Sequence, residues 1–194
     1  WVHQKYPLKA TEKAKDLVRM AVARAALLKP LAERPLEIKQ RGLVIGGGLA
    51  GLNAALSLAR QGFETVLVEQ EKELGGVARR INQTIEGLDV QQYLKDLLEE
   101  ARNDRRIELL TEAKVVGFSG YKGNFVSQVQ IGANGDRRQI EHGVVIVATG
   151  AREYQPKEFG YAAGSNIMTQ LELDELIRDR ESTVAQWKRV FMIQ

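Results

Sequence analysis

The residues best suited to chemistry in this chain are glycines, which form three separated signals. The signals are the run Gly46-Gly47-Gly48-Leu49-Ala50-Gly51, the pair Gly75-Gly76 that follows Glu69, and the strand end Val147-Ala148-Thr149-Gly150. In the first run, Gly46 permits a tight turn, Gly48 removes the side chain that would hold a pyrophosphate away, and Gly51 allows close packing of a helix on a strand. Together the signals predict a dinucleotide site.

The elements around the first run fit that chemistry. Leu43 to Ile45 reads as a short buried strand, and Leu49 to Arg60 reads as the helix that follows it. The phosphates would then meet the N-terminus of the helix, where unpaired N–H groups and the helix dipole favour an anion. A tight turn without a ligand is the alternative, and the register of strand, glycines and helix disfavours it.

Glu69 indicates what lies beyond the phosphates. It ends the predicted strand 65–68 and stands eighteen residues after Gly51 (69 − 51), which is the spacing of a ribose-binding acid. A carboxylate there accepts hydrogen bonds from ribose hydroxyls and repels a 2′-phosphate, so NADP is disfavoured. The acid does not distinguish between FAD and NAD as the ligand of this site.

Composition excludes several other classes of site. An apolar fraction of 44% over 194 residues is enough for a globular core, and 28 basic against 25 acidic residues leave a net charge of only +3, which does not indicate nucleic-acid binding. No apolar run approaches a membrane span. The absence of cysteine excludes thiolate-bound zinc, iron–sulfur clusters and redox dithiols from this sequence, so redox chemistry here would belong to a bound cofactor.

No cluster of catalytic or metal-ligating types is visible. His3 and His142 are isolated from other ligand types, and we interpret both as structural or surface residues. The charges after the third glycine signal, Arg152, Glu153 and Lys157, could lie near a bound cofactor, but we interpret them as solvated loop charges. We therefore predict no catalytic triad and no metal site.

The pattern of elements predicts an α/β fold in three parts. Residues 1–40 are expected to form an amphipathic helix, opened by Thr11 and stopped by Pro30, and a linker. Residues 41–160 are expected to form a Rossmann-like domain with a mainly parallel sheet and an antiparallel β-meander at about 113–141. Residues 161–194 are expected to form a helix and the start of a strand leading to an absent second nucleotide-binding half.

Within this plan, each later element has its own signal. Asp89 and Gln92 predict a capping box for a helix over 90–102, and Thr169 and Glu172 predict another for the last helix. The expected strands are 107–110, 113–120, 125–132, 137–141 and 144–148, the last a continuous apolar run typical of a strand buried on both faces. A strand that has just begun at 189–194, and a start at Trp1, indicate a piece of a longer protein.

A Rossmann half followed by a meander and an Ala-Thr-Gly strand end resembles the FAD domain of glutathione-reductase-like flavoproteins with two dinucleotide domains. A plain NAD dehydrogenase lacks that meander. The sequence resembles the heterodisulfide reductase A-type proteins of anaerobes more closely. This resemblance rests on the stretches 10–20, 44–52, 68–79 and 145–156.

The resemblance implies a set of FAD contacts. Gly46, Gly48, Leu49, Ala50 and Gly51 would contact the pyrophosphate. Glu69 would contact the adenosine ribose, with Gln70 beside it also in the cofactor site. The remaining implied contacts are Gly75 and Gly76 along the cofactor, Arg79 toward the flavin end, the backbone of Val115 at adenine, and Ala148, Thr149 and Gly150 over the middle of the cofactor. Arg80 is adjacent to Arg79 and could exchange roles with it.

The resemblance also implies a function. The flavin would transfer electrons while the protein sets its potential, and iron–sulfur clusters and the second nucleotide-binding half would lie outside this sequence. Partners would be other heterodisulfide-reductase-type subunits and an electron-donating protein, in the cytoplasm, without nucleic acid or membrane; a homodimer is compatible with such assemblies. Two alternatives remain: an NAD-binding pyridine nucleotide reductase domain, and a scaffold with a vestigial nucleotide pocket whose N-terminal helix docks another protein of the complex.

Overall fold

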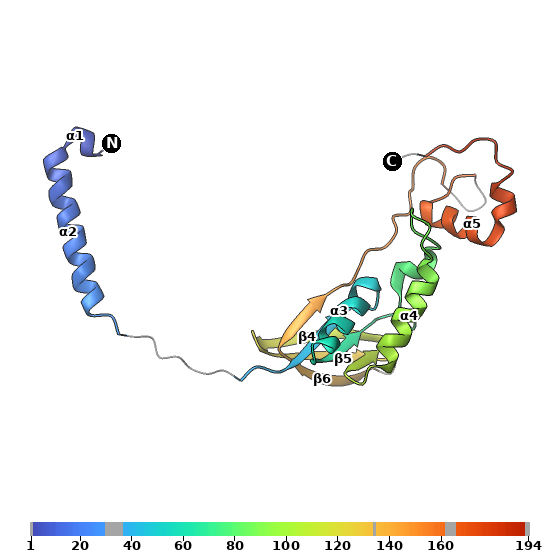
Figure 1. Cartoon of the computed structure of the whole chain (residues 1–194), viewed down its shortest axis with the longest axis horizontal. Helices are drawn as coiled ribbons and strands as arrows, with labels where there is room; N and C mark the ends of the chain where they lie inside the picture. The colour runs from blue at the N-terminus through green and yellow to red at the C-terminus, as the bar shows by residue number, and fades with distance from the viewer. Residues whose placement is uncertain (1, 30–36, 134, 162–165, 193–194) are drawn as a thin grey trace. The chain divides into compact units, whose positions relative to one another are not determined.

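A computed structural model describes residues 2–29, 37–133, 135–161 and 166–192, and divides the chain into two units, 1–36 and 37–194 (Figure 1). The first unit holds helices α1 (Val2–Lys5) and α2 (Pro7–Ala26). The expectation that Thr11 opens the main helix is wrong. Pro7 occupies the first turn, where no N–H is needed, and the Thr11 hydroxyl instead donates to the Pro7 carbonyl at 2.8 Å within the helix. Pro30 lies outside the described residues.

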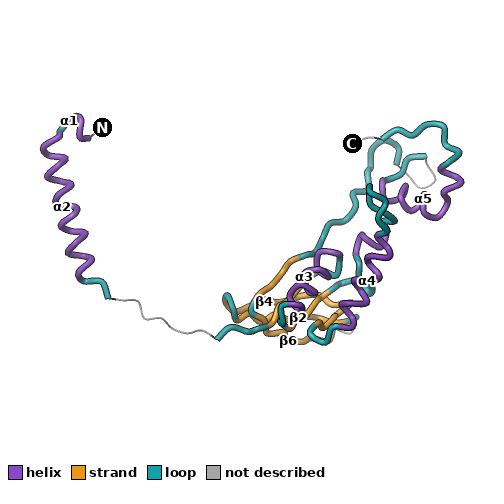
Figure 2. Tube along the Cα trace, in the orientation of Figure 1, coloured by secondary structure: helices purple, strands orange, loops and turns teal. Residues whose placement is uncertain are grey.

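The second unit is built on a four-stranded parallel sheet with the order β3-β2-β1-β7. Figure 2 shows the strands of this unit in orange and its helices in purple. The strands are β1 (Arg41–Ile45), β2 (Glu64–Val68), β3 (Ile107–Leu110) and β7 (Val144–Val147). Helices α3 (Leu49–Arg60) and α4 (Val90–Asn103) form the crossovers between the first three strands, and a 3₁₀ segment, η1 (Gly76–Arg80), precedes α4. The α/β class and the parallel sheet are confirmed.

Alternation along the strands divides the core between the two faces of this sheet. Val44 and Leu67 pack toward α3 and α4, whereas their neighbours Leu43 and Val66 pack toward the meander, and all four are fully buried. The sheet therefore lies between a helical layer and a second sheet. This arrangement leaves the carboxyl ends of the parallel strands free to carry a site.

The predicted meander is confirmed as a separate three-stranded antiparallel sheet, which follows β3 and precedes β7 in the sequence. Its strands are β4 (Ala113–Tyr121), β5 (Asn124–Ile131) and β6 (Asp136–His142), with an irregular register between Val115 and Gly117. The inner face contributes Val129 and Ile140 to the core shared with the parallel sheet. Asn134, in the predicted second turn, lies outside the described residues.

Two strand predictions need correction. β7 is an edge strand and is only partly buried on its two faces: Val145 and Ile146 each pack on one of the two core clusters, but Val144 and Val147 are 46% and 68% exposed. A continuous apolar run indicates that the strand is hydrophobic, but it does not show how far other elements cover each end of the strand. The second prediction concerned the chain end. Residues 189–192 form no strand, and residues 193–194 lie outside the described part.

The two predicted capping boxes have different outcomes. Thr169 and Glu172 cap each other's backbone at the start of α5 (Gln170–Val184), with distances of 3.3 and 2.8 Å. At α4, the Asp89 carboxylate accepts from the Gln92 N–H at 2.9 Å, but the Gln92 side chain donates to Asp96. The box at α4 is therefore only half formed, because the Asp96 carboxylate, one turn later, binds the side-chain amide of Gln92.

His142 is a buried structural residue, as predicted. Its Nε2 lies 2.9 Å from Ser127 Oγ, and its Nδ1 lies 3.0 Å from the Val144 carbonyl oxygen. Because a carbonyl only accepts, Nδ1 carries the proton and Nε2 accepts from the Ser127 hydroxyl. Burial lowers the pKa of His142 below its ordinary value of 6.5.

We expect the second unit to lose stability as the pH falls through about 6.5, because the unfolded chain then binds a proton at His142 that the folded chain resists. Urea unfolding between about pH 7.5 and pH 5.5 measures this effect. His142→Gln should flatten the dependence, whereas His3→Gln, at an exposed position, should leave it unchanged. An equal pH dependence in the wild type and His142→Gln would contradict the prediction.

Candidate functional site

The carboxyl ends of three adjacent parallel strands meet at one edge of the sheet. The Gly46 N–H donates to the Val68 carbonyl at 2.8 Å, and the Ala148 N–H donates to the Ile45 carbonyl at 2.8 Å. These bonds continue the ladder one residue past each strand, so the first glycine run, Glu69 and the third glycine signal start from the same edge. Ligands of open α/β sheets bind at this edge.

The structure also brings the first and second glycine signals into contact. The Gly75 N–H donates to the Gly47 carbonyl at 2.7 Å, and Gly48 and Gly75 form an isolated parallel bridge. A Cβ on Gly76, whose φ is +53°, would lie 3.3 Å from Gly48 Cα. The backbone from Gly46 to Gly48 and the backbone at Gly75 and Gly76 therefore run side by side, without side chains between them.

Two glycines of the first run are required by the protein itself. Gly46 has a φ of +111°, and a Cβ there would lie 2.2 Å from the Ala148 carbonyl oxygen. A Cβ on Gly51 would lie 1.8 Å from the Gly46 carbonyl oxygen, so α3 could not approach the loop with any larger residue. These positions confirm the tight turn and the close helix packing inferred from the spacing.

Gly48 differs from every other glycine that the structure describes. Its φ of −75° suits any residue, and a Cβ there would meet no protein atom within 4 Å. Each of the other described glycines has either a positive φ or a neighbour closer than 3.4 Å to such a Cβ. Gly48 is also the N-cap of α3, with no side-chain cap. The fold thus gives no reason for glycine here, and the space above Gly48 is open at a helix N-terminus.

Glu69 is half-buried below this loop and is already hydrogen-bonded. Its Oε2 accepts from the Gly47 N–H at 2.5 Å, and its Oε1 accepts from the Glu71 N–H at 2.8 Å. The carboxylate therefore holds the glycine loop against the end of β2, a role that the spacing alone did not indicate. Its assignment to a ribose stays a prediction, as does that of Gln70, which is exposed.

The structure separates the two arginines of η1. Arg79 forms an ion pair with Glu73 and is about half exposed, whereas Arg80 binds Glu153 and Glu175. The interpretation of Glu153 as a solvated loop charge is wrong, because its side chain is 18% exposed and accepts from Arg80 Nη1 at 3.0 Å. Glu153 and Glu175 follow Arg80 by 73 and 95 positions in the chain (153 − 80 and 175 − 80), so no local sequence signal could have predicted these ion pairs.

The remaining predicted contacts are distributed around the same edge. Leu49 and Ala148 are half-buried, while Ala50, Thr149 and Gly150 are exposed. Val115 lies in β4 and packs, partly buried, against the core cluster beneath the parallel sheet, as a core valine does. Its contact with adenine through the backbone stays a prediction.

Sequence reasoning missed one residue that shapes this edge. Gln91, in the first turn of α4, donates from Nε2 to the Ala78 carbonyl at 2.9 Å and also bonds the Ile81 carbonyl. It thereby fixes η1 from the side of α4. Within the described ranges, no group of three His, Cys, Asp or Glu residues could hold a metal ion, and no helix is long and apolar enough to cross a bilayer.

A family model described as pyridine nucleotide-disulphide oxidoreductase matches residues 40–192. The chain belongs to this family. It is 44% identical over 131 residues to an iron-sulfur A-type subunit of the CoB–CoM heterodisulfide reductase of Methanopyrus kandleri, and the match covers 67% of this chain and 20% of that protein. It is 43% identical over 132 residues to the A-type subunit of the H₂:CoB–CoM heterodisulfide,ferredoxin reductase of Methanothermobacter marburgensis, with the same coverage.

The chain thus spans about one fifth of the length of these curated relatives. Among solved structures, L-proline dehydrogenase from P. horikoshii matches with a TM-score of 0.53 and 25% identity, covering 66% of this chain and 26% of that one. The match supports the fold derived above, a parallel sheet between helices and a meander. These matches confirm that the chain is similar in sequence to heterodisulfide reductase A-type proteins, as we inferred from its motifs.

Proposed function

We propose that the second unit binds FAD and serves as the electron-transfer module of a heterodisulfide-reductase-A-like oxidoreductase. The observation that carries the proposal is Gly48, a glycine that the fold does not require, facing open space at the N-terminus of α3. A pyrophosphate seated there explains the missing side chain, because any Cβ would occupy its place.

The neighbouring residues fit the rest of such a ligand. Glu69 lies at the end of β2, where its carboxylate can exchange a backbone hydrogen bond for the ribose hydroxyls. Gly75 and Gly76 leave the backbone bare beside Gly48, so an extended cofactor can run along it. The meander between β3 and β7 favours FAD over NAD, since the resemblance to FAD domains rests on it.

Bound FAD would supply the redox chemistry at its isoalloxazine ring, which accepts and donates electrons. The chain's own residues would bind the adenosine half, orient the cofactor and limit the access of water. The three-part division at 1–40, 41–160 and 161–194 belongs to the same proposal, with electrons passing in the longer protein between this module, iron–sulfur clusters and partner subunits. We place that assembly in the cytoplasm.

The first test is the visible absorption spectrum of the purified chain after incubation with FAD and desalting. Flavin bands that survive desalting support the proposal. Saturable binding of NADH without FAD would favour the NAD-binding domain instead, and the absence of any saturable nucleotide binding would favour the scaffold. Titration with ADP adds a probe for the adenosine half alone.

Glu69→Ala is expected to weaken FAD and ADP binding by about 10- to 100-fold, the effect of losing one or two charge-assisted hydrogen bonds. Glu69→Gln keeps an oxygen that can accept from the Gly47 N–H but loses the charge, so it should fall between the wild type and Glu69→Ala. It should also bind 2′,5′-ADP better relative to ADP, because the repulsion of the 2′-phosphate is removed. Unchanged FAD binding in Glu69→Ala would refute the ribose contact.

A further inference from the structure

Arg80 joins three segments that are far apart in the sequence. Its Nε donates to Glu175 Oε1 of α5 at 2.5 Å, and its Nη1 donates to Glu153 Oε2 in the loop after β7 at 3.0 Å. The three side chains are only partly exposed, at 38% for Arg80, 18% for Glu153 and 32% for Glu175. One guanidinium thus connects η1, the exit of β7 and α5 in a partly dehydrated setting.

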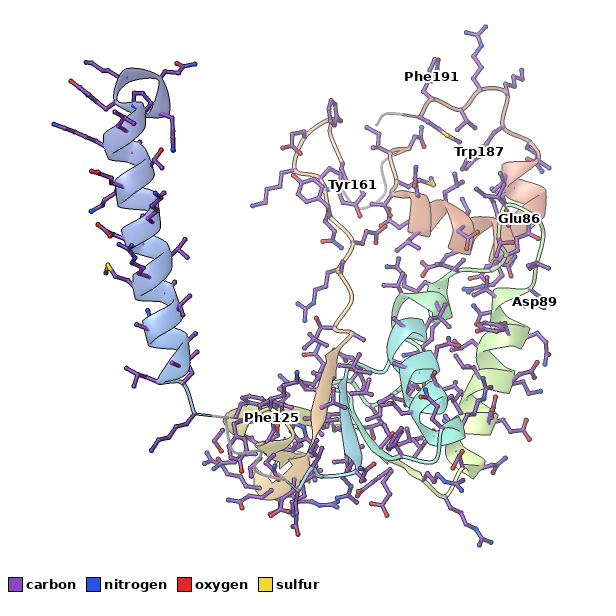
Figure 3. The ribbon with its side chains drawn as sticks, turned by 60° about the vertical axis from the view of Figure 1, so that its left-hand side comes forward. Glu86, Asp89, Phe125, Tyr161, Trp187 and Phe191 are labelled. Carbon is purple, nitrogen blue, oxygen red and sulfur yellow. The ribbon has the colours of Figure 1, made fainter. Side chains whose placement is uncertain are left out.

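Further hydrogen bonds support the same junction. The Asp174 carboxylate of α5 accepts from the Asn82 N–H at 2.7 Å, just beyond η1. The Tyr161 hydroxyl donates to Glu172 Oε1 at 2.6 Å, which ties the loop after β7 to the start of α5. Figure 3 labels Tyr161 on the loop that leaves β7. The junction is therefore a network, and networks are worth more than isolated surface pairs.

The position of this network gives it a consequence for the cofactor. Arg80 lies five residues beyond Gly75, which bridges Gly48, and Glu153 lies three residues beyond Gly150. The Arg80–Glu153 pair thus bridges the two segments that leave the pyrophosphate edge, one through η1 and one through the end of β7. The part of a cofactor that extends beyond the pyrophosphate would lie along these two segments, so its binding depends on the distance between them.

We propose that Arg80 is a positioning residue that holds the loop after β7 and α5 against η1 and thereby shapes the site beyond the FAD pyrophosphate. This inference rests on the proposed function. It assigns to Arg80 a role that acts through Glu153 and Glu175, without contact to the cofactor. The fork of the guanidinium is needed, because Nε and Nη1 each serve a different carboxylate, and a lysine ammonium lacks this planar geometry.

The test compares Arg80→Gln and Arg80→Lys with the wild type in two measurements. Titrations with FAD and with ADP separate the whole cofactor from its adenosine half. Arg80→Gln should weaken FAD binding about tenfold and ADP binding by less than about twofold. The FAD affinity of Arg80→Lys should lie between those of the wild type and Arg80→Gln. Hydrogen exchange of the ligand-free chain should accelerate in residues 151–161 of Arg80→Gln.

Arg60→Gln is the matched control, since Arg60 forms a bidentate ion pair with Glu100 between α3 and α4, away from the glycine edge. It should leave both titrations and the exchange of residues 151–161 unchanged. Glu153→Gln should reproduce the FAD-selective loss in part. This agreement would identify the loop after β7 as the segment that Arg80 positions.

Three results would overturn the inference. Equal weakening of FAD and ADP in Arg80→Gln would show a general structural role, and unchanged FAD binding would show no role at all. If the wild-type chain binds no FAD, the proposed function fails and the cofactor role of Arg80 fails with it. In that case, the exchange measurement still reports separately whether Arg80 holds residues 151–161.

Discussion

Gly48→Val is expected to abolish retention of FAD while the second unit still folds. The added side chain meets no protein atom near its Cβ, so it has room in the ligand-free chain, but it occupies the place proposed for the pyrophosphate. We expect FAD to bind about 100-fold or more weakly, the equivalent of about 3 kcal/mol. Titration by visible absorption measures the affinity, and thermal unfolding measures the stability.

Gly48→Ser provides the control for helix capping. Serine is a preferred N-cap residue, so it should keep or raise the stability of α3 while it still places a side chain over the loop. Both variants should therefore lose FAD although only valine weakens the cap. Wild-type affinity for FAD in Gly48→Val would remove the observation on which the proposed function depends.

Gly51→Val is expected to have the opposite profile, with the fold itself lost. Even the Cβ of an alanine would lie 1.8 Å from the Gly46 carbonyl oxygen, and because that oxygen belongs to the backbone, no flexible side chain can move away to make room. We expect a loss of at least about 4 kcal/mol of stability, which exceeds most point substitutions and comes close to the whole stability of many domains. Circular dichroism and urea unfolding report the loss.

Ser57→Val tests whether a β-branched residue in α3 is by itself enough to cause the loss of stability expected for Gly51→Val. Ser57 is exposed on α3, so this variant should lose less than about 1 kcal/mol. Gly51→Ala should remain severely destabilised, since the clash begins at Cβ. A Gly51→Ala chain with wild-type stability would show that α3 does not pack as closely on the glycine loop as the structure has it.

Much of the fold was predictable because its signals are local. The run from Gly46 to Gly51 between an apolar strand and an amphipathic helix, the turns of the meander, and the capping box of Thr169 and Glu172 each lie within a few residues. Such patterns reflect the conformational preferences of the backbone and the alternation of apolar residues, so they depend little on residues distant in the chain. Helix starts were less secure, as Pro7 shows for α2.

By itself, the sequence determined the glycine edge and the elements that carry it. Only the tertiary structure decided that β7 lies at the edge of the sheet, that Gly75 bridges Gly48, and that Glu69 holds the Gly47 N–H. It alone separated Arg79, paired with its neighbour Glu73, from Arg80, paired with Glu153 and Glu175. The physical reason is that sheet order and ion-pair choice depend on residues distant in the chain, whose meeting follows from packing and leaves no local pattern.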